Sequence, residues 1–182
     1  MLRRLVKGCA LFSSGIRKIW VKATNQGVQF GADVFLDSGV RIRVVDGARL
    51  IIGDRTTIAR GTTIICKEGM LSIGADGFIG ERVTLVARDH IEIGADALIS
   101  SDVTIRDMAH GTERNGVPFR SQPSITKPIA IESNVWLGVG VTVLLGVRIG
   151  ADSVVGAHAV VNKDVPAGVL AVGVPAGVVR KD

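Results

Sequence analysis

The chain contains three histidines, and these side chains are the best suited to move a proton at neutral pH. His90, His110 and His158 are its only imidazoles, and an unperturbed imidazole titrates near pH 6.5. His110 stands three residues after Asp107, and His90 directly follows Asp89. A neighbouring carboxylate can orient an imidazole, although Asp is also a frequent turn residue. General acid–base chemistry is therefore the first chemistry that these residues suggest.

The two cysteines, Cys9 and Cys66, form neither a metal-binding nor a disulfide pattern. Neither lies in a CxxC sequence or beside a His at ligand spacing. We therefore expect no zinc site and no disulfide framework, and a reducing, cytoplasmic compartment fits this cysteine usage. No apolar run approaches the roughly 18 residues needed to cross a bilayer, and the first residues lack the pattern of a secretory signal. We expect the chain to stay in the cytosol.

Length and composition indicate one domain rich in short strands. With 182 residues, of which 47% are hydrophobic, the chain can bury a core without disulfides or metal ions. Aromatic residues make up only 4%, Tyr is absent and Gly occurs 23 times, so Ile, Val, Leu and Ala carry the apolar content. This mixture favours short strands separated by tight corners. It excludes a disordered chain and a small disulfide scaffold, and it disfavours a helix bundle.

Residues 1–22 hold the excess positive charge. They contain no acidic residue and six basic ones, which are Arg3, Arg4, Lys7, Arg17, Lys18 and Lys22. Apolar residues recur there at steps of three and four from Leu2 to Ile19, which predicts a basic amphipathic helix. Two interpretations stay open: the helix covers one end of the next domain and turns its charges to solvent, or it docks on an anionic membrane surface. The remaining residues lack a basic stripe with interleaved aromatics, so we expect no nucleic-acid binding.

From Phe30 onward the sequence repeats every six residues. A small or turn-prone residue commonly follows the apolar third residue of a hexad, as in Ile73-Gly74-Ala75-Asp76. Each hexad therefore predicts a short strand followed by a corner, and the whole predicts a β-solenoid. The third residue is apolar at all eighteen positions: Phe30, Leu36, Ile42, Ile52, Ile58, Ile64, Ile73, Ile79, Leu85, Ile93, Ile99, Ile105, Ile131, Leu137, Val143, Ile149, Val155 and Val161.

The hexads are grouped in threes. Extra residues, at 43–49, 65–70, 86–90 and 106–128, always follow a third hexad. A triangular prism explains this spacing, because all insertions then leave from the same corner. Six coils stacked about 4.8 Å apart make a prism about 29 Å tall, whose open ends need covering. The chain would divide into a helix with connector (1–29), a repeat body (30–165) with a projecting loop (106–128), and a tail (166–182).

Several motifs in the C-terminal half resemble those of hexapeptide-repeat acyltransferases. They are NVWLG at 134–138, GVRIG at 146–150, VNKDVP at 161–166 and GVPA at 173–176. They are most similar to the branch that contains galactoside and maltose acetyltransferases and the O-acetyltransferases of bacterial surface polysaccharides. The resemblance covers Phe30 to Val161, and the tail extends it to Arg180. It implies an all-β fold, a left-handed parallel β-helix, whereas general connection rules favour the opposite hand.

The same resemblance implies a homotrimer that holds acetyl-CoA in a groove between adjacent subunits. In such enzymes a His takes the proton of the acceptor hydroxyl, the oxygen attacks the thioester, and backbone N–H groups stabilise the oxyanion. This chemistry needs no metal and no covalent enzyme intermediate. His110 matches the general base, with Asp107 as its orienting partner, and Met108 stands where many relatives have a second His. His90 is the backup base, and His158 is expected at a solvent-facing corner.

The resemblance also implies positions for the cosubstrate and the acceptor. Trp136 is the second residue of its hexad, so we expect its indole to point outward against the cofactor, a second subunit, or both. The small residues Gly138 and Ala157 would let the pantetheine arm of CoA pass close to the backbone, or they simply suit a tight corner. Lys163 and Arg180 would pair with the phosphates of CoA. Gly177 replaces a Lys or Arg common in related tails. The acetyl-CoA candidates are Trp136, Gly138, Ala157, Asn162, Lys163 and Arg180, and the acceptor candidates are Arg114, Asn115 and Arg120.

We therefore predict an acetyl-CoA-dependent O-acetyltransferase that acts on a sugar hydroxyl, in cell-surface polysaccharide or glycolipid synthesis at the inner membrane face. N-acetylation of an amino sugar differs only in the nucleophile and stays open. A non-catalytic solenoid that serves as a binding module also stays open, because a fold alone names no reaction. A γ-class carbonic anhydrase is disfavoured, since the chain lacks an HxxxxH spacing.

Overall fold

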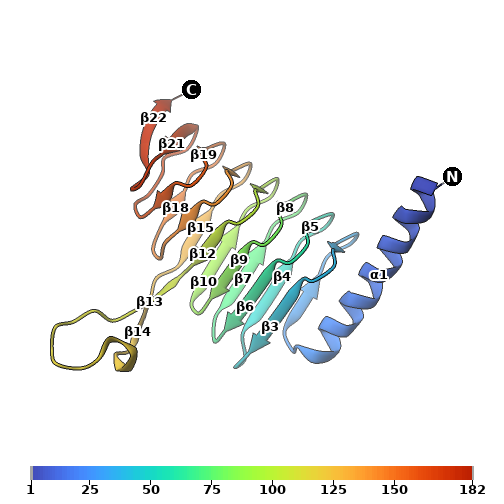
Figure 1. Ribbon diagram of the computed structural model, residues 1–182, viewed down its shortest axis with the longest axis horizontal. Coiled ribbons are helices and arrows are strands. Elements are labelled where there is room, and N and C mark those ends of the chain that lie inside the picture. The colour runs from blue at the N-terminus through green and yellow to red at the C-terminus, as the bar shows by residue number, and fades with distance from the viewer. Residues whose placement is uncertain (1, 182) are drawn as a thin grey trace.

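The protein is a three-sided prism of stacked strands with one helix across its N-terminal end (Figure 1). The structure is a computed structural model that describes residues 2–181, with the backbone alone for residues 2–10 and 180–181. Three sheets, here called A, B and C, form the faces, and consecutive strands from β1 to β12 and from β15 to β20 lie on different faces. This arrangement confirms the predicted triangular solenoid.

Each coil contributes one strand to each sheet, and the strands within a sheet pair in parallel from one coil to the next. Sheet A contains β1 (Val28–Phe30), β4 (Arg49–Ile52), β7 (Met70–Ile73), β10 (His90–Ile93), β15 (Ile129–Ile131) and β18 (Arg148–Ile149). Sheet B contains β2 (Phe35–Leu36), β5 (Thr57–Ile58), β8 (Phe78–Ile79), β11 (Leu98–Ile99), β16 (Trp136–Leu137), β19 (Val154–Val155), β21 (Val169–Val172) and β22 (Gly177–Lys181). Sheet C contains β3 (Arg41–Val45), β6 (Thr63–Lys67), β9 (Thr84–Ala87), β12 (Thr104–Arg106), β17 (Thr142–Val143) and β20 (Val160–Val161).

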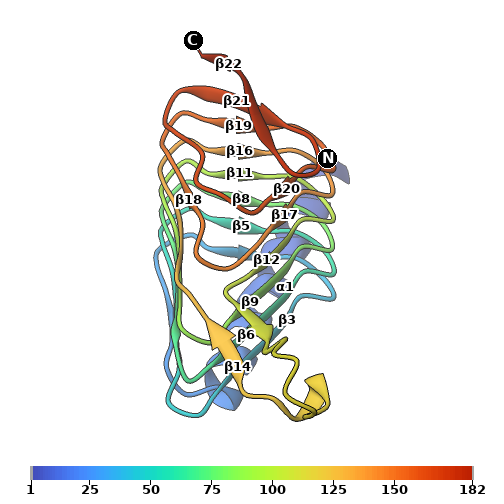
Figure 2. The same ribbon diagram turned by 90° about the vertical axis from the view of Figure 1, so that its left-hand side faces the viewer.

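The coil is left-handed. Figure 2 views the prism from its C-terminal end, and the chain there runs clockwise through sheets A, B and C as it approaches the viewer. This hand agrees with the family resemblance and opposes the general rule for parallel crossovers.

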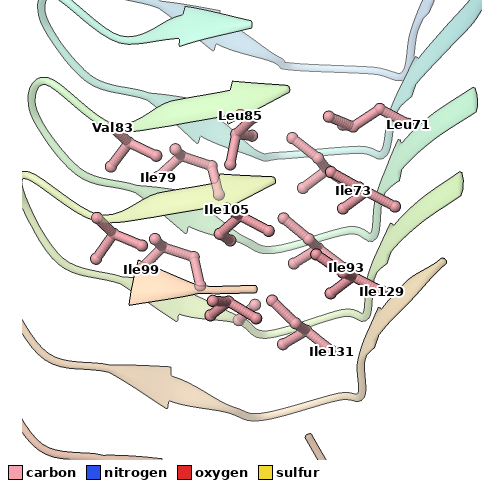
Figure 3. Close-up of a cluster of buried hydrophobic side chains, with 14 of the residues drawn as sticks. Leu71, Ile73, Ile79, Val83, Leu85, Ile93, Ile99, Ile105, Ile129 and Ile131 are labelled. Atoms are coloured by element: carbon pink, nitrogen blue, oxygen red, sulfur yellow. The ribbon is translucent and has the colours of Figure 1, made fainter. Parts of the chain in front are cut away.

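The apolar residues of the hexads form the core. Of the eighteen predicted positions, seventeen are buried, and Phe30, in the first coil, is partly buried against the core. Figure 3 shows Ile79, Ile99 and their neighbours stacked coil upon coil inside the prism. A second interior column, which the hexad pattern alone did not single out, lies two residues earlier on the strands and includes Leu71, Ile91 and Ile129. Each coil therefore packs on the next through like side chains in register, and stability accumulates between neighbouring coils.

The corners between sheets A and B explain the turn residues that follow each hexad. Six successive corners place a non-glycine residue at positive φ: Asp33, Arg55, Asp76, Asp96, Asn134 and Asp152. Asp and Asn tolerate this left-handed conformation better than most residues. Just before this position, a Cβ added to Gly53 would lie 2.6 Å from the backbone nitrogen of Ala75, so only glycine allows the coils to approach. Arg55 also bonds Asp76 of the next coil through both carboxylate oxygens, which lowers the pKa of Asp76.

Helix α1 (Leu2–Thr24) covers the first coil with polar contacts. Ser14 is buried and its Oγ accepts the N–H of Leu36 at 2.9 Å, while Arg17 Nε donates to the carbonyl of Leu36 at 2.9 Å. Asn25, just past the helix, accepts the N–H of Val44 at 2.8 Å. These side chains satisfy backbone groups at the exposed edge of the first coil, which is how α1 closes that end.

The C-terminal end is closed by strands. β21 adds a seventh rung to sheet B by pairing in parallel with β19, and β22 folds back antiparallel onto β21. The expected covering of both ends is thus present. Among residues 2–181, no helix is long and apolar enough to cross a membrane.

Candidate functional site

The largest insertion forms an arm, residues 107–127, that projects from the corner between sheets C and A (Figure 2). Its base is closed by the N–H of Lys127, which donates to the carbonyl of Asp107 at 2.9 Å. Two antiparallel strands, β13 (Met108–His110) and β14 (Ser124–Thr126), stiffen it, and His110 is the partner of Ser124. A short helix, η1 (Phe119–Ser121), lies at its far end.

Asp107 anchors the root of the arm to the coil below. Its side chain is fully buried, and its carboxylate accepts the N–H of Arg88 at 2.8 Å and the N–H of Asp89 at 2.8 Å. The described hydrogen bonds of this carboxylate all go to that corner and not to His110. Only Met108 and Ala109 separate Asp107 from His110, so Asp107 fixes the backbone at the start of the His110 strand instead of making the direct orienting contact that the sequence suggested.

Arg88 is a second anchor, which the sequence reasoning missed. One guanidinium nitrogen donates to Ser124 Oγ at 3.2 Å, and another lies 3.2 Å from Glu68 Oε1. Because Ser124 pairs with His110 across the arm, the chain of contacts from Glu68 through Arg88 fixes the strand next to the imidazole. Arg88 stands 36 residues before Ser124, so no local sequence pattern could have connected them.

The imidazole of His110 faces solvent. His110 is exposed, and among the described residues no hydrogen bond or ion pair occupies its ring nitrogens. Beside it, Gly111, Asn115 and Gln122 help to line a depression of about 100 Å³. Sites for small molecules usually measure some 300–1,000 Å³. A single chain therefore presents a free base on a fixed arm but not a complete pocket.

Gln122 organises the rest of the arm. It is buried, its Nε2 donates to the carbonyls of Glu113 and Val117, and its Oε1 accepts the N–H of Glu113 at 3.0 Å. The predicted acceptor residue Asn115 accepts the N–H of Val117 at 3.1 Å and so forms the turn. The other two acceptor candidates, Arg114 and Arg120, are exposed on the same arm.

The other two histidines lie outside the arm. His90 begins β10, next to the corner that Asp107 caps, and its Nε2 lies 4.0 Å from Glu92 Oε2. It is thus close to the root of the arm, as the coil stacking predicted. His158 is exposed at the corner between sheets B and C with a φ of 58°, which agrees with the predicted corner position.

Trp136 points outward from sheet B, as predicted. Its indole N–H donates to Ser100 Oγ at 3.1 Å, and 47% of the residue is exposed. In the two coils below it, Leu98 and Phe78 occupy the same register and are each 43% exposed. The three side chains form an apolar strip on the outer face of sheet B, defined here as the sheet B strip.

The remaining cofactor candidates fall into two places. Gly138 and Ala157 stack at the corner between sheets B and C, where a Cβ on Gly138 would lie 2.7 Å from the nitrogen of Ala157. Coil stacking alone therefore accounts for this glycine. Asn162 and Lys163 are exposed after β20, and in the described chain their side chains make no hydrogen bond or ion pair. The backbone of Arg180 lies in β22, and its side chain is outside the described part.

The base and the B–C corner lie on different ridges of one chain. β12 leads from Asp102 at the B–C corner to Asp107 at the C–A corner, and five residues of extended chain span roughly 16 Å. A nucleophile beside His110 must approach the carbon it attacks to about 3.5 Å. One chain does not bring Gly138 and Ala157 together with His110.

Nucleophilic catalysis by a cysteine and binding of a metal ion find little support in the described side chains. Cys66 is fully buried, and burial together with the nearby Asp107 charge raises the pKa of its thiol to about 12. Because the thiolate is the nucleophile, Cys66 is inert at neutral pH. Among residues 11–179, whose side chains the structure describes, no group of three or more His, Cys, Asp and Glu side chains is placed to hold a metal ion.

Comparisons of the sequence identify hexapeptide-repeat proteins. Residues 128–163 match the family described as the hexapeptide repeat of succinyl-transferase. A probable acetyltransferase of Mycobacterium tuberculosis is 34% identical over 165 residues, which are 90% of this chain and 55% of that protein. A galactoside O-acetyltransferase of Lactococcus lactis is 41% identical over 103 residues, covering 54% of this chain and 47% of that protein. The chain thus spans about half the length of these curated relatives.

Solved structures share the fold. A hexapeptide-repeat containing acetyltransferase from Vibrio cholerae, complexed with acetyl coenzyme A, is 26% identical with a TM-score of 0.53, covering 92% of this chain and 76% of that one. An N-acyltransferase from Bacillus cereus in complex with dTDP and 3-hydroxybutyryl-CoA has a TM-score of 0.76 over 91% of this chain and 87% of its own. At 19% identity the latter supports the fold alone. The resemblance inferred from the motifs is confirmed.

Proposed function

We propose that this chain, a hexapeptide-repeat protein, is an O-acetyltransferase that uses acetyl-CoA and acts on a sugar hydroxyl, with His110 as its general base. The observation that carries the proposal is the unoccupied imidazole of His110 on an arm fixed at its root by Asp107 and Arg88. The names of the relatives support acetyl transfer, and the L. lactis galactoside O-acetyltransferase supports a hydroxyl acceptor. N-acetylation of an amino sugar would use the same base.

The transfer would proceed in one displacement. A ring nitrogen of His110 takes the proton of the acceptor hydroxyl while its oxygen attacks the thioester carbonyl carbon. The C–O bond forms, the C–S bond breaks, and the sulfur of CoA leaves and recovers the proton from the imidazolium. Because the buried Cys66 thiol stays protonated, it is not available for an acetyl-enzyme intermediate, and direct transfer is the simpler path.

The separation of the two ridges supports a homotrimer with the site between subunits. A cyclic arrangement can bring the arm of one subunit against the B–C corner of the next. The sheet B strip of Phe78, Leu98 and Trp136 would be covered by this contact, which explains why apolar side chains of this size face outward. Trp136 would then contribute to both the subunit interface and the cofactor groove.

The acetyl-CoA groove would follow the B–C corner to the C-terminal end. Ala157 is small and exposed there, with Gly138 buried against it, and Lys163 and Arg180 supply positive charge for the phosphates of CoA, with Asn162 beside them. Arg114, Asn115 and Arg120 on the arm would meet the acceptor, together with the exposed Phe119. Cysteine usage supports a cytosolic enzyme. A role in making surface polysaccharide or glycolipid is supported by an Escherichia coli relative named a putative lipopolysaccharide biosynthesis O-acetyl transferase, which is 36% identical over 122 residues, covering 63% of this chain and 62% of that protein.

Thiol release from acetyl-CoA, measured against a panel of sugars, nucleotide sugars and lipid-linked glycans, tests the proposal. On the best acceptor, His110→Ala should lower kcat by at least about a hundredfold, since general base catalysis supplies roughly that factor. The matched variant His90→Ala removes the nearest alternative imidazole and should keep most of the activity. Full activity in His110→Ala would show that the base is wrong, and no transfer to any acceptor would favour the non-catalytic module.

A further inference from the structure

The helix α1 packs against the prism with its polar side and turns an apolar side to solvent. The contacts with the first coil come from Ser14, Arg17 and the buried Val21. The exposed residues are large and apolar: Leu11 is 64% exposed, Phe12 74%, Ile16 53%, Ile19 71% and Trp20 64%. Figure 1 shows the outer side of α1 facing away from every sheet. The expectation that the helix covers an end is confirmed, but the side it leaves in water is the apolar one.

This outer side is a continuous surface. Phe12, Ile16, Ile19 and Trp20 follow one another at steps of four, three and one residues, which places them together on a helix. We call the set of Leu11, Phe12, Ile16, Ile19 and Trp20 the α1 apolar face. Five side chains of this size, each more than half exposed, exceed the scattered apolar residues normal on a protein surface.

The charge around the α1 apolar face is of one sign. Residues 1–22 contain six basic residues and no acidic one. Lys18 and Lys22 lie one turn apart, at the border between the docked side and the apolar side, and Lys22 Nζ stands 5.8 Å from the centroid of the Phe30 ring. An apolar helix face bordered by basic residues fits an anionic lipid surface, where the apolar side enters the headgroup boundary and the cations meet lipid phosphates.

A second copy of the chain is the competing occupant. If two α1 helices packed through their apolar faces, their basic borders would also meet, and Lys18 and Lys22 of each copy would bring four like charges together without an acidic partner in either segment. An anionic bilayer reverses the sign of that interaction. Charge complementarity therefore favours lipid over a second helix.

We propose that the α1 apolar face docks the protein on anionic membranes, with α1 lying in the plane of the interface and the prism standing in water. The polar contacts of Ser14 and Arg17 with Leu36 hold the helix in this inverted orientation before it meets lipid. The helix thus needs no rearrangement to bind. This proposal does not depend on the acetyl transfer proposed above.

Flotation of the full-length chain with lipid vesicles tests the docking. Vesicles of phosphatidylcholine containing phosphatidylglycerol should carry the protein, and vesicles of phosphatidylcholine alone should carry about tenfold less, with binding weakened by salt. The triple variant Phe12→Gln, Ile16→Gln, Ile19→Gln should lower binding by at least about tenfold. All three side chains are exposed, so the fold should persist, as circular dichroism would check. Val174→Gln with Val179→Gln, two exposed apolar residues at the other end of the prism, is the matched control and should bind like the parent.

Tryptophan fluorescence gives a second measurement. In a Trp136→Phe background, Trp20 is the only indole, and its emission should shift to the blue and be quenched by brominated lipid. Unchanged emission with anionic vesicles, or equal flotation of parent and triple variant, would overturn the proposal. The proposal would also be overturned if the parent protein did not bind vesicles and light scattering showed a smaller oligomer for the triple variant than for the parent. The α1 apolar face would then be a contact between copies of the chain.

The outcomes for docking and for catalysis are separable. The triple variant should retain acetyl transfer to a soluble acceptor, because α1 lies outside the proposed site, whereas His110→Ala should float like the parent. If His110→Ala lost flotation together with the triple variant, the docking proposal would be contradicted and the catalytic proposal would be unaffected. Absence of transfer by a parent protein that floats would contradict the catalytic proposal alone.

Discussion

The substitution Arg88→Met would separate the positioning of His110 from the stability of the prism. The methionine keeps an apolar stem of similar length but removes the contacts to Ser124 and Glu68 that hold the arm. The backbone N–H of Arg88 continues to bond Asp107, so the root of the arm remains anchored. The arm should therefore loosen on the side of β14 while the coils stay intact.

The magnitude follows from the exposure of the partners. The Arg88 side chain is 25% exposed and that of Glu68 is 53% exposed, so their ion pair contributes about 0.5–1 kcal/mol. The bond to Ser124 contributes about another 1 kcal/mol. Loss of about 1.5–2 kcal/mol changes the ratio of docked to undocked arms by about 12- to 30-fold, and kcat should fall by up to that factor. Because Arg88 Nε is buried without a partner among the described residues, the melting temperature should change little.

Steady-state thiol release measures the effect. The KM for acetyl-CoA should stay within about twofold, because the B–C corner is not altered, and hydrogen exchange of residues 107–127 should accelerate. Arg55→Met is the matched control, since it breaks a similar ion pair with Asp76 at the A–B corner, away from both the arm and the B–C corner. If both variants have the same kcat and the same exchange in the arm, Arg88 does not position the base.

Three further predictions concern the body of the prism. Ile99→Ala should lower the free energy of unfolding in urea by about 2–5 kcal/mol, because this side chain is fully buried between coils; a loss below about 1 kcal/mol would contradict tight coil stacking. The Cys66 thiol titrates near pH 9 when unfolded and at about 12 when folded, so the folded state holds its proton longer and stability falls as pH rises from about 9 toward 12. Cys66→Ala should lose this part of the alkaline decline in urea titrations between pH 8 and pH 11, and identical slopes would refute it. Leu98→Lys places a charge in the sheet B strip and should convert the proposed trimer to monomers, as light scattering would measure; an unchanged assembly would exclude this strip from the interface.

The hexad pattern was enough to predict the prism because each strand has only one way to bury its apolar residues. The positions from Leu36 to Val161 reappear inside the structure, and the insertions leave from one corner as the spacing required. Trp136 faces outward for the same reason, since side chains alternate along a strand.

The pattern could not predict which side of α1 meets the prism. Periodicity shows that the helix has a polar and an apolar side, but the choice is made by the edge of the first coil. That edge presents backbone groups of Leu36 and Val44 that need hydrogen-bond partners, and Ser14, Arg17 and Asn25 supply them. These backbone groups need partners only once the coil has folded, so the sequence of the helix alone does not predict which side will dock.

The hydrogen bonds that hold the arm carrying His110 could not be predicted from the sequence either. Asp107 was chosen for its closeness to His110, yet its carboxylate bonds the corner of the coil below. Gln122 and Arg88 act across 9 and 36 residues, respectively. Such contacts depend on how the arm returns to the prism, whereas the local pattern reports only burial and turns.

Mixing of two inactive variants is the most direct test of a site shared between subunits. Ala157→Trp should block the cofactor groove and His110→Ala removes the base, so each protein alone should be inactive. If an arm and a B–C corner from adjacent subunits form each site, random trimers from an equal mixture, after unfolding and joint refolding, should regain about a quarter of parental activity. No recovery, with mixed trimers verified by mass spectrometry, would contradict the shared site.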